Sequence, residues 1–314
     1  MHKLRLLTIA MLVLPGIGCI SAVAQEEGGG RHLQLPPGAT LTMVAATQAD
    51  PTLKTEYDNP SIVVLPKNPR PELVVFLPGS HGSPQAASNL FGVLTAGGYR
   101  GISLMYEDVP SEADACKENN PDPSGPDPQC SRLFREERIF GDAPDAAVQN
   151  TVQQSIDYRL VKLLQYLDKQ QPSKGWGQYL NGDQPAWSKI IITGHSQGAG
   201  HAAYIAKKFK VARVVLFSGP ADFVGEKGKE HAADWVTEPN KTPAADWYGF
   251  YHEKERGAQA FVFTYPALGL TADHTYIEHL EPTSTNKAAY HTAGPSDIRY
   301  APQWRAFFGI EPVK

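Results

Sequence analysis

The sequence predicts an α/β fold: one doubly wound, mostly parallel sheet with a loop insertion that carries a disulfide. Three observations lead to this prediction. Short apolar, β-branched runs alternate with helical patterns, two cysteines flank a polar loop, and a glycine-flanked serine follows one apolar run at residues 194–198. Strands that alternate with helices form βαβ units, in which the strands lie parallel. A chain of 314 residues with 41% hydrophobic residues can bury such a sheet.

The first part of the predicted sheet comes from short runs rich in β-branched residues. Residues 40–46 and 61–65 predict two strands, which we expect to form a peripheral antiparallel pair. Residues 72–77 form a near-continuous apolar run, the pattern of a buried central strand. A helix over 86–97 and a strand over 101–106 complete this part, with the cysteine loop at the carboxyl end of the last strand.

The second part begins with the strongest helical pattern in the chain, over residues 145–170. Its apolar residues recur at spacings of three and four and form one stripe: Val148, Val152, Ile156, Leu160, Leu163, Leu164 and Leu167. A strand over 189–193 and a helix of small residues over 198–209 follow. Residues 213–217 and 246–251 predict two further strands.

Residues 1–24 predict a secretory signal peptide. They combine a basic start, a 15-residue apolar stretch over 6–20 and small residues before the expected cleavage point. We favour cleavage there over lipid attachment at Cys19, and we expect an exported protein, periplasmic or extracellular. Residues 25–39 then form a flexible lead-in, and residues 40–314 form a single domain.

The two remaining cysteines, Cys116 and Cys130, flank a stretch rich in Pro, Asp, Asn and Gly. In an oxidising compartment, such a pair is expected to form a disulfide. Closing a loop of about 15 residues stabilises the folded state by roughly 3 kcal/mol in the chain-entropy model. Neither cysteine belongs to a metal-ligand spacing, and we expect no metal site.

Charge and hydropathy exclude two classes of protein. The net charge is −4 and no cluster of Lys and Arg is present, which argues against binding of nucleic acid. No apolar run reaches the roughly 20 residues of a membrane-spanning helix, so we expect no transmembrane segment in the mature chain.

Residues 194–198 read Gly-His-Ser-Gln-Gly, a G-x-S-x-G motif between a predicted strand and a predicted helix. In that context the motif is a nucleophile elbow, a sharp turn whose strained backbone needs neighbours without side chains. Gly194 and Gly198 meet this need, and Gly200 would let the helix approach the sheet. Ser196 is therefore the predicted nucleophile, beside a helix amino terminus that favours developing negative charge.

An acyl-transfer site also needs two N–H donors that converge on the oxyanion. The first is the backbone N–H of Gln197, directly after the nucleophile. The second is expected from the loop over residues 77–82, because it follows the central strand and would lie beside Ser196. Ser80 is the predicted donor in this loop, with His81 as the neighbouring option.

A serine hydroxyl needs a base, and the order along the chain in this type of site is nucleophile, acid, histidine. That order leaves His274, His279 and His291 as candidates. We favour His291, because it lies in a turn-like segment past the last predicted strand.

The acid should follow the strand after residues 213–217. Glu255 fits that position and is the predicted acid. Asp222 is the alternative, because some hydrolases take the acid from the preceding strand. Glu255 can also be interpreted as part of a solvated charge cluster.

These motifs resemble the α/β hydrolases, and in particular secreted bacterial members that are similar to serine esterases and lipases. The resemblance extends over residues 73–308 and rests on the Leu-Pro-Gly-Ser segment 77–80, the paired-cysteine insertion, the elbow with its Gly-His-Ala-Ala continuation and the late histidine. The sequence departs from that pattern at Glu255, where an aspartate is usual.

The resemblance implies a Ser–His–acid hydrolase that needs no cofactor. Carboxylic esters, small or polymeric, are the expected substrates, cleaved through an acyl-enzyme. An amidase or peptidase on the same triad, and a catalytically silent binding protein of the same fold, are the alternatives. The sequence leaves the oligomeric state open.

Overall fold

An eight-stranded sheet forms the centre of the computed structural model, which describes residues 33–118, 127–225, 228–286 and 288–310. The predicted signal peptide and the first part of the lead-in lie outside the described residues. In sheet order the strands are β1 (Thr40–Val44), β2 (Ser61–Leu65), β4 (Arg100–Ser103), β3 (Leu73–Leu77), β7 (Ile190–His195), β8 (Arg213–Phe217), β11 (Trp247–His252) and β12 (Thr275–Glu278).

The strand order confirms the predicted fold class. Strands β4, β3, β7, β8, β11 and β12 run parallel to their neighbours, whereas β2 pairs antiparallel with both β1 and β4. Counted within this sheet, the order is 1-2-4-3-5-6-7-8, and the serine turn follows the fifth strand. This is the arrangement of the α/β-hydrolase fold.

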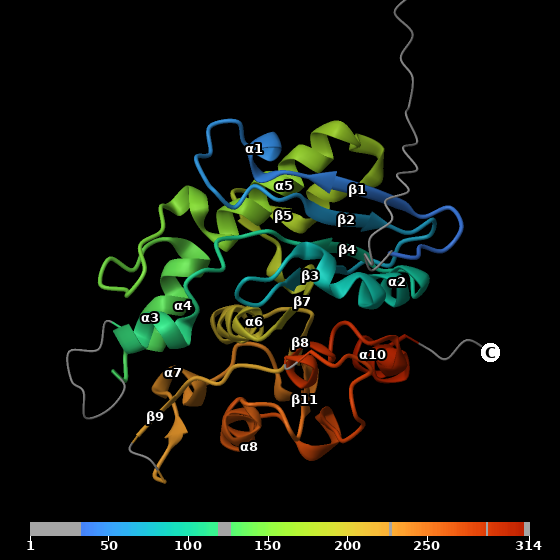
Figure 1. The fold of residues 1–314 in the computed structure, drawn as a ribbon. Helices are drawn as coiled ribbons and strands as arrows, with labels where there is room; N and C mark the ends of the chain where they lie inside the picture. Colours follow the sequence, from blue (N-terminus) through green and yellow to red (C-terminus); the bar gives the residue numbers. More distant parts are fainter. Residues whose placement is uncertain (1–32, 119–126, 226–227, 287, 311–314) are drawn as a thin grey trace, which may run out of the picture. The chain divides into compact units, whose positions relative to one another are not determined.

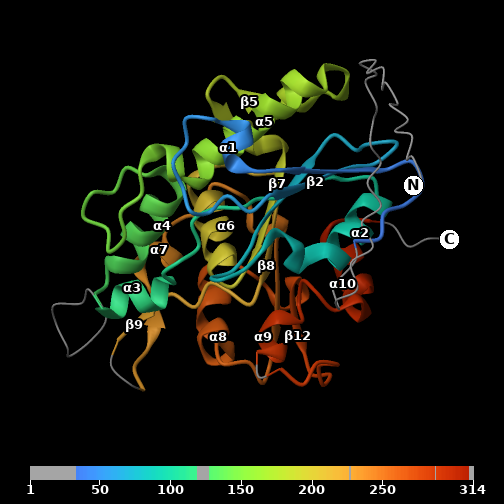
Figure 2. The same ribbon diagram turned by 45° about the horizontal axis from the view of Figure 1, so that its top comes forward.

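Helices cover both faces of the sheet. The described helices are α1 (Ala46–Ala49), α2 (Ser88–Ala96), α3 (Glu112–Glu118), α4 (Cys130–Phe140), α5 (Ile156–Gln170), α6 (Gln197–Lys208), α7 (Asp234–Thr237), α8 (Ala258–Ala267), α9 (Ala289–Thr292) and α10 (Ala301–Phe307). One apolar core packs α5, α6 and α8 on one face, and a second packs α2 and α10 on the other. Figures 1 and 2 both show α3 and α4 on the side of α6 away from α2 and α10.

The prediction of one long helix over residues 145–170 is wrong in its first third. The helix α5 begins at Ile156, where the hydroxyl of Ser155 accepts the N–H of Tyr158. The preceding segment is held in another conformation, because the carboxylate of Glu137 accepts the backbone N–H groups of Ala143 and Asn150. Side-chain bonds to a buried carboxylate replace the helical ones there.

The predicted disulfide between Cys116 and Cys130 is confirmed. It joins two helices that the sequence pattern did not predict, α3 and α4, and they pack against each other with Phe134 and Val148 in a small apolar cluster. The insertion follows β4, which ends at Ser103 and is shorter than predicted. No helix among the described residues is long and apolar enough to cross a membrane.

Short two-stranded pairs complete the described structure. Strands β5 (Leu180–Asn181) and β6 (Gln184–Pro185) form one hairpin before β7. Strands β9 (Phe223–Val224) and β10 (His231–Ala232) form another after β8, and this hairpin lies next to α8. The second hairpin brings Phe223 to the cleft described below.

Candidate active site

Ser196 occupies a strained turn between β7 and α6. Its backbone angles are φ 54° and ψ −119°, which residues with a Cβ rarely adopt. The turn is fixed to the next strand, because the Ser196 N–H donates to the carbonyl oxygen of Phe217 at 2.9 Å. A Cβ at Gly198 would overlap the carbonyl oxygen of Leu77. The glycine after the serine is therefore required for helix α6 to approach β3.

Gly200 has a different role from the one expected. A Cβ at this position would overlap the guanidinium group of Arg135, not the sheet. The missing side chain thus makes room for a charged group of α4 against helix α6. Arg135 uses this space to donate to the carbonyl oxygen of Gln197 at 3.0 Å.

The strained serine lines a cleft of about 920 Å³. Its wall includes residues from both halves of the sheet edge: Ser80, Glu112, Ser196, Gln197, Glu255 and His291. Apolar side chains from the β9–β10 hairpin and α8, namely Phe223, Phe261 and Phe263, line another part of it. A volume of this size is in the range of clefts that hold small organic ligands.

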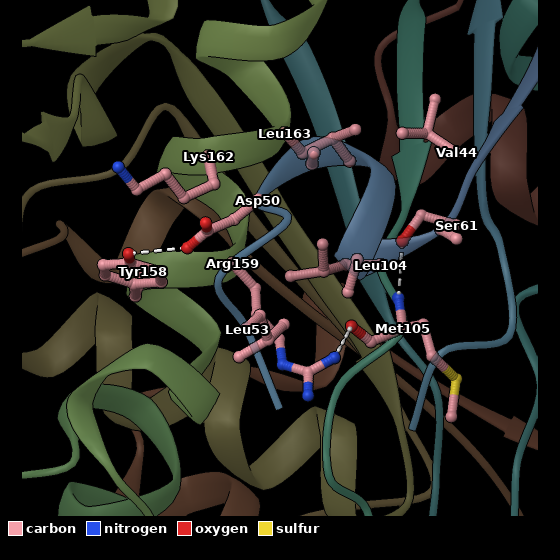
Figure 3. Close-up of a pocket in the computed structure, with 13 residues that line it drawn as sticks. Val44, Asp50, Leu53, Ser61, Leu104, Met105, Tyr158, Arg159, Lys162 and Leu163 are labelled. Atoms are coloured by element: carbon pink, nitrogen blue, oxygen red, sulfur yellow. Dashed lines mark hydrogen bonds between the residues drawn. The ribbon is translucent and has the colours of Figure 1, made fainter. Parts of the chain in front are cut away.

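A second cavity, far smaller, lies between α1 and α5 and has a volume of about 10 Å³. Figure 3 shows its polar side chains engaged with one another: the Tyr158 hydroxyl donates to Asp50 at 2.8 Å, and Ser61 accepts the N–H of Met105 at 3.0 Å. A cavity of this volume is close to the lower limit for one water molecule. The candidate site is therefore the large cleft.

His291 and Glu255 form a hydrogen-bonded pair at the cleft. The ring Nδ1 of His291 lies 2.5 Å from Oε2 of Glu255, whose side chain is fully buried. The other carboxylate oxygen accepts the Ser218 hydroxyl at 2.9 Å and the backbone N–H of His252 at 2.8 Å. With Nδ1 bound to the carboxylate, Nε2 of His291 is the nitrogen left to accept a proton.

Ser196 and His291 share the cleft, but no hydrogen bond between the Ser196 hydroxyl and the His291 ring is present among the described residues. In hydrolases this link often tightens only when substrate is bound. His291 lies in the short helix α9 rather than in the turn expected from the sequence.

The other candidate histidines lie away from the cleft lining. His274 stacks on the ring of Tyr248 with 4.4 Å between centroids. His279 is exposed and pairs with Glu253 at 2.8 Å. The structure thus brings only His291, of the three late histidines, to the lining of the cleft.

Asp222, the alternative acid, lies in a different cluster. Its two oxygens accept bidentate hydrogen bonds from Arg135, at 2.7 and 3.1 Å, and one of them also accepts the Trp235 ring N–H. Both partners of this ion pair are buried. Because a buried arginine needs its counter-charge, Asp222 serves Arg135 rather than a histidine.

The two predicted oxyanion donors lie at the same cleft. Gln197 is the first residue of α6, and N–H groups of the first turn have no partner within a helix. Ser80 lies in the loop after β3. The two residues are joined, because the Ser80 hydroxyl donates to the side-chain oxygen of Gln197 at 3.1 Å. His81, the other option, is exposed and holds a φ of 54°.

The side chain of Gln197 connects these donors to the insertion. Its oxygen also accepts the backbone N–H of Glu112 at 2.9 Å, and its amide donates to the carbonyl oxygen of Asp108 at 2.9 Å. The disulfide-bonded insertion is thereby attached to the site from α3, by Glu112, and from α4, by Arg135.

Four residues of the site were missed at the sequence level: Glu112, Arg135, His195 and Ser218. Burial, together with the charge of Asp222, raises the pKa of Glu112 to about 8. Burial lowers the pKa of His195 to about 3. His195 and Ser218 stand directly beside predicted elements, but nothing in their spacing indicates their partners.

Among the described residues, no group of three or more His, Cys, Asp or Glu side chains is placed to hold a metal ion. The polar groups at the cleft are those of acid–base and nucleophilic chemistry.

Comparisons with known proteins give remote structural similarity. No family model matches the chain, and no curated protein matches it. Among solved structures, a ferulic acid esterase has a TM-score of 0.46 at 12% identity, over 86% of this chain and 99% of that one. Esterase B from Lactobacillus rhamnosis has 0.45 at 11%, over 88% and 87%. Esterase 2 of Thermogutta terrifontis has 0.44 at 12%, over 88% and 97%. The fold and the site are therefore described from this chain's own strand order and contacts.

Proposed function

We propose that this chain, which has the fold of the α/β hydrolases, is a serine hydrolase that cleaves carboxylic esters through an acyl-enzyme formed on Ser196. The observation that carries the proposal is the His291–Glu255 pair, which lies in the same cleft as a serine held at a strained strand-to-helix turn. A histidine oriented by a buried carboxylate is the arrangement that activates a serine hydroxyl.

In the first half of the reaction, His291 Nε2 takes the proton of the Ser196 hydroxyl while Oγ attacks the ester carbonyl carbon. The tetrahedral intermediate then breaks its bond to the alkoxy oxygen, and His291 returns the proton to the leaving alcohol. Glu255 stays ionised, holds the proton on Nδ1 and stabilises the imidazolium. In the second half, water repeats the sequence and releases the carboxylic acid with free Ser196.

The backbone N–H groups of Gln197 and Ser80 are the proposed donors to the oxyanion. Support comes from the position of Gln197 at the amino terminus of the twelve-residue helix α6, where unpaired N–H groups and the helix dipole favour negative charge. Removal of one such donor typically costs 10²- to 10³-fold in kcat.

The substrate is proposed to be a small ester or the ester end of a polymer. A cleft of about 920 Å³ with an aromatic wall suits a compact organic group beside the scissile bond. We also propose that the protein is exported, because a disulfide joins α3 to α4 and disulfides persist mainly in oxidising compartments.

The test is covalent labelling with a fluorophosphonate probe, followed by turnover assays. Labelling that is lost in Ser196→Ala, together with hydrolysis of p-nitrophenyl esters, supports the proposal. Faster turnover of peptide p-nitroanilides than of esters would identify an amidase or peptidase instead. Absence of labelling in the folded wild-type protein would overturn the hydrolase function and leave a binding protein.

A further inference from the structure

The backbone carbonyl of His291 depends on side chains for its hydrogen bonds. His291 is the third residue of the four-residue helix α9, and the last carbonyl groups of a helix have no partner within it. Two side chains reach this oxygen: His195 through Nε2 at 2.8 Å, and Ser218 through its hydroxyl at 3.3 Å. The conformation of the segment that carries His291 is thus set from outside α9.

A count of protons shows which of these side chains is the donor. The Ser218 hydroxyl has one proton, and two acceptors lie near it: Glu255 Oε1 at 2.9 Å and the His291 carbonyl at 3.3 Å. The carboxylate is closer and buried, and a bond to an ionised acceptor is about twice as strong as one to a neutral acceptor. The Ser218 proton therefore goes to Glu255, and the carbonyl of His291 is left to His195.

The chemistry of the His195 ring agrees with a donor role. A carbonyl oxygen only accepts, so Nε2 of His195 must carry a proton. Burial lowers the pKa of this ring to about 3, which keeps it neutral under ordinary conditions. His195 therefore presents a fixed Nε2–H and exchanges no proton with the cleft.

His195 is also the residue directly before Ser196, at the carboxyl end of β7. Its ring lies against the ring of His291, with 4.7 Å between centroids. One side chain thereby connects the turn that carries the serine to the segment that carries the base. The separation of Ser196 and His291 depends on this connection as well as on Glu255.

We infer that His195 is a positioning residue: its Nε2–H holds the carbonyl of His291 and so sets the reach of the His291 imidazole toward Ser196. This inference rests on the proposed function. It assigns a role to the second residue of the Gly-His-Ser-Gln-Gly motif that the motif itself does not specify.

The first experiment compares His195→Gln with His195→Asn. Both substitutions supply a neutral amide, but only glutamine places its nitrogen at the position of Nε2, whereas asparagine matches Nδ1. We expect His195→Asn to lower kcat for a p-nitrophenyl ester by about one to two orders of magnitude with little change in KM, because a misplaced base slows chemistry rather than binding. His195→Gln should restore most of that loss. Equal kcat values for the two variants, at equal thermal stability, would overturn the inference.

A second measurement needs no variant and no turnover. In protein labelled with ¹⁵N-histidine, long-range proton–nitrogen NMR distinguishes the two neutral tautomers, and loss of one signal set in His195→Gln identifies the residue. We expect His195 to be the Nε2–H tautomer and to remain neutral down to pH 5. An Nδ1–H tautomer, or titration of this ring above pH 5, would overturn the inference even for an active esterase. If the protein fails to react with fluorophosphonate while the tautomer is as expected, the proposed function fails and the contact stands.

Discussion

The hydroxyl of Ser218 lies 2.9 Å from Oε1 of Glu255, and Ser218 adopts a φ of 55° directly after β8. This left-handed conformation costs a residue with a Cβ roughly 1–2 kcal/mol. The strain is maintained by the surrounding structure, because the Ser218 N–H also donates to the carbonyl oxygen of Phe250 at 2.8 Å. A hydroxyl is thus held against the buried carboxylate at some expense in backbone energy.

Two substitutions at Ser218 separate its hydrogen bond from its backbone. Ser218→Ala and Ser218→Gly both remove the hydroxyl, so we expect the same loss of kcat, about tenfold, from a less firmly held Glu255. Glycine tolerates the left-handed conformation, so Ser218→Gly should be more stable than Ser218→Ala by about 1 kcal/mol. Urea unfolding and steady-state kinetics measure the two effects. A kcat that follows stability, higher in the glycine variant, would contradict this assignment.

The acid of the triad is tested by Glu255→Gln against Asp222→Asn. Loss of the Glu255 charge removes the partner of His291 Nδ1, and we expect kcat to fall by about 10³- to 10⁴-fold in a folded protein. Loss of the Asp222 charge leaves Arg135 buried without its counter-ion, and we expect the free energy of unfolding to fall by about 3–5 kcal/mol.

The readouts for this pair are kcat per fluorophosphonate-reactive site and the free energy of unfolding in urea. If Asp222→Asn abolished turnover at normal stability and Glu255→Gln did not, Asp222 would be the acid.

The carboxyl of Glu112 predicts a pH dependence of stability. Burial and the nearby Asp222 raise the pKa of Glu112 from 4.5 to about 8 in the folded protein. Between these two values the unfolded chain has lost the proton and the folded protein keeps it, so the contribution of Glu112 to stability falls as pH rises through this window. Arg135 does not prevent the shift, because it is already paired with Asp222.

Glu112→Gln cannot ionise, and its free energy of unfolding should fall less between pH 5 and pH 8 than that of the wild type. Urea unfolding at both pH values measures this. Asp114→Asn is the matched control, because Asp114 is exposed on the same helix and lines the same cleft. An identical pH dependence in Glu112→Gln and the wild type would show that Glu112 is ionised in the folded protein.

The disulfide is expected to stabilise the fold and to order the cleft wall. Replacement of Cys116 and Cys130 by alanine opens a loop of about 15 residues and should lower the free energy of unfolding by roughly 3 kcal/mol. Because α3 contacts the side chain of Gln197 through the Glu112 N–H, KM for a p-nitrophenyl ester should rise as well. A reducing agent should reproduce both effects in the wild type and change nothing in the double variant. Unchanged stability would mean that the packing of α3 on α4 suffices.

The elements with a strong local signal could be predicted from the sequence. Strands β2 and β8 have the predicted bounds, 61–65 and 213–217, because each is a short β-branched run that lies buried in the sheet. Helix α4 was missed because its buried face includes charged residues, Arg135, Glu137 and Arg138. Burial of these charges depends on partners distant in the sequence, and hydrophobic periodicity contains no record of them.

The early start of the helix predicted over 145–170 has a related cause. Val148 and Val152 fit the helical spacing, but Val148 packs in the cluster around the disulfide and Val152 is 55% exposed. In the site, the G-x-S-x-G motif indicated Ser196 because its meaning depends only on the neighbouring strand and helix. The contacts of Ser218 and His195 with the His291 segment span 73 and 96 residues, and only the folded chain brings them together.

The space left by Gly200 makes the insertion and helix α6 mutually dependent. Because the Arg135 guanidinium occupies the volume of a missing side chain, the two helices of the insertion cannot be transplanted to another scaffold of this fold unless a glycine is present at the equivalent place. The same dependence guides engineering of this chain: a library that varies the cleft wall should keep Arg135, Asp222 and Gly200 as one inherited unit.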